Sequence, residues 1–191
     1  GSMKYRFTIA AIALAAILYY WIQPMNPKPD YETVFDTRWT QGERLKWSVV
    51  LKGIRWKFPK AVHISADSLA GLLSPSPDAL PILLDVRAPE EYEISHLPGA
   101  IRAETLDEAL AALEDTGSDR DVILYCSVGY RSSELAQKLN GEGFERLFNL
   151  EGGLFRWANE GRPLAQSEAK VHPFDRLWGT LLDSSRTAIV D

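Results

Sequence analysis

The hydrophobic pattern between residues 61 and 165 alternates short apolar runs with helical segments. The apolar runs have the length and continuity of buried strands in a parallel sheet, and they occupy residues 61–64, 82–86, 99–102, 122–125 and 146–150. Helical spacing follows each of them, at residues 67–73, 89–94, 106–113, 132–139 (with Gly141 as a stop signal) and 154–160. This order predicts an α/β domain with a central parallel sheet and helices on both faces.

A separate amphipathic helix is predicted at residues 40–60. Thr40 and Glu43 have the spacing of a capping box, and Pro59 ends the pattern. Its apolar positions recur at helical spacing, and its other positions carry basic residues: Arg44, Lys46, Lys52, Arg55 and Lys57. Such a helix either lies on an anionic bilayer or docks its apolar side on the domain that follows.

Residues 3–22 predict a single membrane anchor. Lys4 and Arg6 precede an apolar stretch, residues 7–22, which ends in the aromatic residues 19–21. A cleaved signal peptide is less consistent with the bulky residues after the stretch, and a helix packed on protein is the remaining alternative. Residues 1–2 have the look of a cloning remnant. Residues 23–39, with three prolines, predict a linker.

Composition and charge narrow the range of possible functions. The chain is 46% hydrophobic and 25% charged, which is ordinary for a globular protein. Its net charge of −5 is unevenly distributed, because residues 1–60 carry +6 and residues 61–191 carry −11. An acidic main body argues against a nucleic-acid partner. A single cysteine, Cys126, excludes a disulfide within the chain and a multi-cysteine metal site, and we expect neither a metal nor a cofactor.

Cys126 lies one step beyond the predicted strand 122–125, at the edge of the sheet where parallel α/β folds bind ligands. The first amides of the following helix have no internal partners, and a tight turn directs further N–H groups inward. Arg131 adds positive charge. We therefore expect a lowered thiol pKa and a reactive thiolate near neutral pH. The alternative is a small cysteine packed as a hydrophobic residue.

Five motifs follow one another in a fixed order: LLDVR at 83–87, EEY at 90–92, HLPGA at 96–100, YCSVGYRS at 125–132, and LEGG at 150–153 with Trp157. As an ordered set they resemble a single-domain rhodanese, over about residues 61–165. The loop from Cys126 to Arg131 has the family's six residues, whereas related phosphatase-type loops are one residue longer. The resemblance implies a cradle for a sulfur atom rather than a phosphate, which disfavours a phosphatase or arsenate reductase.

The resemblance also implies roles for individual residues. Cys126 would be the nucleophile that accepts sulfane sulfur as a persulfide. The loop residues Ser127, Val128, Gly129, Tyr130 and Arg131 would bind the anionic sulfur and its donor. Asp85, Arg87 and His96 fit the family's supporting positions, with purely structural roles as the alternative. The expected activity is sulfur transfer from thiosulfate or a persulfide to a thiol or cyanide.

Four further expectations complete the sequence interpretation. A non-catalytic binding or sulfur-carrier module with the same fold is the alternative function. The positive flank of residues 3–22 favours a cytoplasmic N-terminus and an external or periplasmic domain, although the basic helix 40–60 would suit the cytoplasmic face. Residues 166–191 lie outside the resemblance and are expected to pack as a C-terminal extension, and His63 is expected to be a core residue rather than a ligand.

Overall fold

The structure is a computed structural model that describes residues 39–73, 80–114, 120–167 and 169–190. The chain divides into two compact units, Gly1–Pro59 and Lys60–Asp191. Within the described ranges, every helix is too short or too polar to cross a bilayer. The anchor predicted at residues 3–22 lies outside the described residues, as does the predicted linker except for Trp39, so both stay predictions.

The predicted amphipathic helix is present as α2, Gln41–Lys57. Its capping box is formed as expected: the Thr40 hydroxyl accepts a hydrogen bond from the Glu43 amide at 3.3 Å, and the Glu43 carboxylate accepts one from the Thr40 amide at 2.8 Å. The Phe58 amide still bonds back to the carbonyl of Ile54, and Pro59 then prevents continuation.

The second unit contains a five-stranded, fully parallel sheet in the order β1-β5-β4-β2-β3. The strands are β1 (His63–Ile64), β2 (Ile82–Asp85), β3 (Ile101–Arg102), β4 (Val122–Tyr125) and β5 (Leu147–Leu150). Strand β4 is central, and all four of its residues are buried. The predicted fold class, a parallel α/β sheet with helices, is confirmed.

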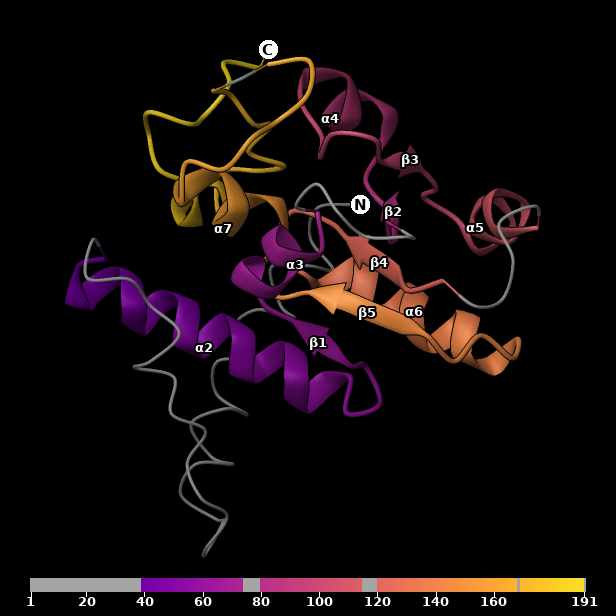
Figure 1. Cartoon of the computed structure of the whole chain (residues 1–191). Coiled ribbons are helices and arrows are strands. Elements are labelled where there is room, and N and C mark those ends of the chain that lie inside the picture. Colours follow the sequence, from indigo (N-terminus) through magenta and orange to yellow (C-terminus); the bar gives the residue numbers. More distant parts are fainter. Residues whose placement is uncertain (1–38, 74–79, 115–119, 168, 191) are drawn as a thin grey trace, which may run out of the picture. The chain divides into compact units, whose positions relative to one another are not determined.

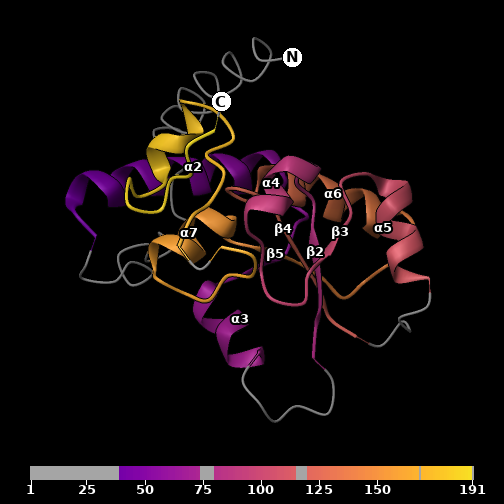
Figure 2. The ribbon, with the colours of Figure 1, turned by 90° about the horizontal axis from the view of Figure 1, so that it is seen from above.

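Helices cover both faces of this sheet (Figures 1 and 2). They are α3 (Ala66–Leu72), α4 (Pro89–Ile94), α5 (Leu106–Leu113), α6 (Tyr130–Gly141) and α7 (Gly153–Asn159). One hydrophobic core joins alternate residues of β2 and β4 to α5 and α6, and it includes Leu84, Leu124 and Leu139. Because side chains alternate along a strand, Tyr125 faces the opposite side from Leu124.

The C-terminal extension packs against the same unit, beside α7 (Figures 1 and 2). Val171, Leu181 and Leu182 are buried, and Leu181 ends a short 3-10 helix, η1 (Trp178–Leu181). The Asn159 side chain in α7 donates to the Leu181 carbonyl and accepts from the Asp183 amide, both at 2.8 Å. These bonds hold the extension to the domain.

Candidate active site

Cys126 leaves the carboxyl end of β4 and begins a loop that runs directly into α6. The residue is 1% exposed, and its sulfur accepts a hydrogen bond from the Gly129 amide at 3.2 Å. Gly129 is the N-cap of α6 with φ +100°, and a side-chain carbon there would lie 3.0 Å from the Asn149 amide nitrogen. Glycine is therefore required for the turn that directs an amide at the sulfur.

Opposing influences set the pKa of the Cys126 thiol. Burial alone raises this pKa, because it disfavours the charged thiolate. The positive charge of Arg131 lowers it, and so do hydrogen bonds from Ser132 and from the backbone of Val128. The net result is a pKa below the ordinary value of cysteine. The site thus favours the nucleophilic form of the thiol.

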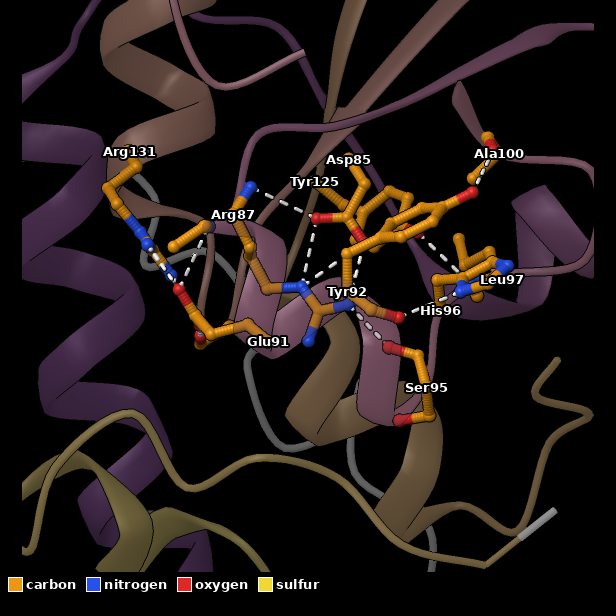
Figure 3. Close-up of polar contacts among 12 residues, drawn as sticks. Asp85, Arg87, Glu91, Tyr92, Ser95, His96, Leu97, Ala100, Tyr125 and Arg131 are labelled. Atoms are coloured by element: carbon orange, nitrogen blue, oxygen red, sulfur yellow. Dashed lines mark hydrogen bonds and ion pairs between the residues drawn. The ribbon is translucent and has the colours of Figure 1, made fainter. Parts of the chain in front are cut away.

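Arg131, from the first turn of α6, is held by two hydrogen bonds to one carboxylate (Figure 3). Its two terminal nitrogens lie 2.7 and 2.8 Å from the oxygens of Glu91, and one of them also donates to the Ser127 hydroxyl at 3.0 Å. The Ser127 hydroxyl donates to Glu91 at 2.9 Å. Glu91 is 2% exposed. Burial acts to raise its pKa, but the bonds and charge of Arg131, with the charge of Arg87 and a bond from the Ala88 amide, together lower it.

Helix α7 supports the backbone of the cysteine loop through its first amides. The Leu154 amide donates to the Cys126 carbonyl at 2.9 Å, and the Phe155 amide donates to the Ser127 carbonyl at 3.0 Å. This contact is possible because Gly153, with φ +55°, has no side chain: a carbon added there would overlap the Cys126 carbonyl oxygen. The LEGG motif therefore brings the first amides of α7 to the back of the loop.

The predicted supporting residues Asp85 and Arg87 form a buried ion pair at the end of β2, with nitrogen and oxygen 2.6 Å apart. Arg87 also donates to the Ser95 carbonyl at 2.6 Å, and its guanidinium carbon lies 5.9 Å from the centre of the Tyr125 ring. Burial acts to lower the pKa of Arg87, but the bonds to Asp85 outweigh it and raise the pKa. The pair braces the segment before Cys126 rather than the loop itself.

His96, the third predicted supporting residue, lies on the far side of Arg87 from Arg131 in Figure 3. Its ring stacks on Tyr92 with centres 3.8 Å apart, and its Nδ1 lies 2.9 Å from the Tyr92 carbonyl. The Tyr92 hydroxyl donates to the Ala100 carbonyl at 2.8 Å. These contacts suit a structural role. His63, expected in the core, is half-buried and lies 3.1 Å from the Asn149 side chain.

The structure brings five of the predicted loop residues together: Cys126, Ser127, Val128, Gly129 and Arg131. Tyr130 is half-buried in the first turn of α6. The sequence interpretation assigned no role to two residues that contact Arg131. Glu91 appeared there only as part of a motif. The other is Phe174, whose ring centre lies 4.6 Å from the guanidinium carbon.

The described residues contain no cluster of three or more His, Cys, Asp or Glu side chains arranged to hold a metal ion. What they present instead is a buried thiol of lowered pKa at the end of the central strand, with the Gly129 amide donating to its sulfur and a paired arginine beside it. An atom or small group attached to this sulfur would carry its negative charge into the same set of donors. The geometry suits nucleophilic covalent chemistry.

Comparisons with known proteins place the second unit among related sequences. A family model described as "Rhodanese-like domain" matches residues 65–160. The chain is 32% identical over 106 residues to a protein named "Sulfurtransferase" from Allochromatium vinosum, a match that covers 56% of this chain and 96% of that protein.

Other similar proteins are larger than the matched segment. The chain is 35% identical over 82 residues to "Probable adenylyltransferase/sulfurtransferase MoeZ" from Mycobacterium tuberculosis, covering 42% of this chain and 21% of that protein. A crystal structure of a thiosulfate sulfurtransferase from Pseudomonas aeruginosa is similar with a TM-score of 0.52 and 24% identity, over 58% of this chain and 21% of that chain. This structural likeness supports the fold.

Proposed function

Because the chain belongs to the rhodanese-like domain family, we propose that it is a sulfurtransferase in which Cys126 carries the transferred sulfur as a persulfide. Relatives named as sulfurtransferases support sulfur transfer at the level of the family. The observation that carries the proposal for this chain is the Cys126 thiol, buried at the end of β4 with a lowered pKa and an amide donor at 3.2 Å.

In the first half-reaction, the Cys126 thiolate attacks the sulfane sulfur of the donor. A new S–S bond forms on Cys126, and the S–S bond of the donor breaks with its electron pair. Thiosulfate would release sulfite, and an organic persulfide would release a thiolate. In the second half-reaction, a thiol or cyanide attacks the outer sulfur of the persulfide and returns Cys126 to its thiolate form.

The loop is well suited to the intermediate. A persulfide anion extends one atom further than a thiolate, and its charge is stabilised by preorganised amides of residues 127–131 at the start of α6. Arg131 holds the loop closed through Ser127 and Glu91. Asp85, Arg87 and His96 act in this proposal as structural supports, which their own hydrogen bonds and stacking favour.

A mass measurement tests the proposal most directly. After incubation with thiosulfate or glutathione persulfide, the chain is expected to gain one sulfur atom, which cyanide then removes as thiocyanate. Cys126→Ser is nearly isosteric, so we expect its free energy of unfolding to lie within about 1 kcal/mol of that of the native chain. We also expect this variant to gain no sulfur. Loss of folding in this variant would indicate a structural cysteine.

A sulfur-carrier or binding module is the second candidate. The 1% exposure of Cys126 favours it, because a buried sulfur is hard for a small acceptor to reach. A carrier would gain sulfur from a persulfide donor but would release it only to one partner protein. Rapid, repeated turnover with cyanide or a small dithiol would exclude the carrier function. A persulfide that forms and then resists these acceptors would support it.

A further inference from the structure

Phe174 belongs to the C-terminal extension, beyond the residues 65–160 that the family model matches. Its ring lies over the guanidinium of Arg131, with the ring centre 4.6 Å from the guanidinium carbon. Arg131 keeps 26% side-chain exposure. An aromatic ring from outside the common domain therefore lies over the arginine whose charge lowers the pKa of the Cys126 thiol.

The backbone holds Phe174 in a specific and unfavourable conformation. Its φ is +65°, and the Asp175 amide donates to the Pro173 carbonyl at 2.8 Å, which makes Phe174 the centre of a γ-turn. The Phe174 amide donates to Nδ1 of His172 at 2.9 Å. A bulky residue adopts positive φ only where its surroundings impose it. The surrounding structure of the extension therefore imposes the conformation in which this ring contacts Arg131.

The positive charge beside Cys126 already has an anionic partner, because Arg131 forms two hydrogen bonds with Glu91. Thiosulfate carries two negative charges and would have to approach the Cys126 sulfur beside a cation that is already paired. A sulfonate placed against the Phe174 ring would also lose water without gaining a hydrogen bond from that side chain. The carbon part of an organic persulfide would instead bury apolar surface against that ring.

We propose that Phe174 is a specificity-determining residue that makes an organic persulfide a better sulfur donor than thiosulfate. This inference rests on the proposed function. The step it favours is R–S–SH + Cys126–S⁻ → Cys126–S–SH + R–S⁻. The bond between the two donor sulfurs breaks, its electron pair leaves with R–S⁻, and the new persulfide then loses its proton to solvent.

The first test compares two donors with the full-length chain, using glutathione persulfide and thiosulfate with cyanide as the acceptor. We expect kcat/KM to favour the persulfide. In Phe174→Ala this preference should fall by about fivefold or more, the size of one lost aromatic or apolar contact. Phe174→Leu keeps apolar bulk without a ring, so an intermediate preference would support the contribution of the ring. Leu177→Ala, which alters a 43% exposed residue of the same segment, should leave the preference unchanged.

The second test needs no sulfur transfer. Because Cys126 is the single cysteine of the chain, its alkylation can be followed with neutral iodoacetamide and anionic iodoacetate. The native chain should discriminate against the anion more than Phe174→Ala does, after correction for the reactivity of a free thiol. Thermal unfolding of each variant checks that the fold is retained.

The outcomes separate the two proposals. Sulfur transfer with the same donor preference and the same alkylation ratio in the native chain and in Phe174→Ala would overturn the role of Phe174 and leave the proposed function intact. A changed alkylation ratio without sulfur loading from either donor would refute the proposed function and still identify Phe174 as a filter at Cys126. A native preference for thiosulfate would also overturn the inference.

Discussion

The pKa of the Cys126 thiol depends on the positive charge of Arg131, which is itself paired with the Glu91 carboxylate. Arg131 lowers the thiol pKa, while burial acts against ionisation. Removing Arg131 should therefore raise the pKa of Cys126. We expect the pH midpoint of iodoacetamide alkylation to lie below that of a free thiol in the native chain and to move upward in Arg131→Ala. An unmoved midpoint would remove Arg131 from thiolate stabilisation.

Glu91→Gln provides the matched control for that measurement. It removes the negative charge that offsets Arg131 and keeps the size of the side chain. The alkylation midpoint should then move downward or stay, in contrast to Arg131→Ala. Upward shifts in both variants would mean that the geometry of the loop, rather than the charge of Arg131, sets the thiol pKa.

The Glu91–Arg131 pair should also contribute to stability. We expect Glu91→Gln to lower the free energy of unfolding by roughly 1 to 3 kcal/mol at pH 7, less than for a fully buried pair because Arg131 is 26% exposed. The pKa of Glu91 is lowered in the folded state. Its contribution is therefore present above the ordinary pKa of a glutamate and is lost as the pH falls through the lower, folded value.

Chemical denaturation at several pH values checks this prediction. The difference between the native chain and Glu91→Gln should be largest near neutral pH and should shrink under acidic conditions. A difference that stays constant down to pH values below the ordinary glutamate pKa would show that the carboxylate charge contributes nothing to the pair.

Residues differed in how far their roles could be predicted. The position of Cys126 was predictable, because its place after an apolar run puts it at the sheet edge, and its reactivity stays a prediction. The contact of Glu91 with Arg131 joins residues forty positions apart, and local patterns carry no information about such a distance. The contact of Phe174 with Arg131 could not be predicted, because neither the hydrophobic periodicity nor the family motifs extend to residue 174. Its placement also depends on a positive φ.

At the level of elements, the support of the cysteine loop by α7 depends on Gly153. An alanine there would overlap the Cys126 carbonyl and approach the Ser127 carbonyl carbon within 2.8 Å, so α7 would have to move away from the loop. We expect Gly153→Ala to lower the free energy of unfolding by roughly 2 to 4 kcal/mol, from positive-φ strain and overpacking together. Alkylation of Cys126 should slow as the loop loses its support.

Gly99→Ala is the control that separates strain from overlap. Gly99 also has positive φ, at +78°, but nothing lies within 4 Å of an added side-chain carbon. This variant should lose only about 1 kcal/mol and keep the native alkylation rate. Equal losses in the two variants would show that backbone strain alone, and not the approach of α7 to the loop, is what matters at Gly153.

The elements themselves were mostly predictable, because each has a clear period and clear boundary signals. Strand β4 and helices α4 and α5 have the predicted bounds. Strands β1 and β3 are shorter than predicted, since each pairs on only one side and the ladder there spans two residues. Helix α6 begins at Tyr130, two residues early, because the left-handed conformation of Gly129 lets the helix start directly after it.

At the level of the whole molecule, the two compact units carry opposite charge. Residues 1–59 carry a net charge of +5 and residues 60–191 carry −10. All the residues of the candidate site belong to the unit Lys60–Asp191. A chain that begins at Lys60 should therefore fold and transfer sulfur with the kcat of the full-length chain. Loss of folding in this shorter chain would mean that the unit needs residues 1–59 for stability.

Three chain lengths test the membrane prediction for the first unit. The apolar stretch 7–22 predicts that the full-length chain sediments with vesicles even at high salt, because burial of apolar surface is insensitive to screening. A chain beginning at Trp39 keeps the basic helix α2 and should bind only anionic vesicles, and only at low salt. A chain beginning at Lys60 should bind neither type. Release of the full-length chain by salt would refute the anchor.

The orientation of the anchor needs a separate experiment. Lys4 and Arg6 predict that the domain lies on the external side of the membrane. A reporter fused to the C-terminus that is active in the cytoplasm would refute this orientation.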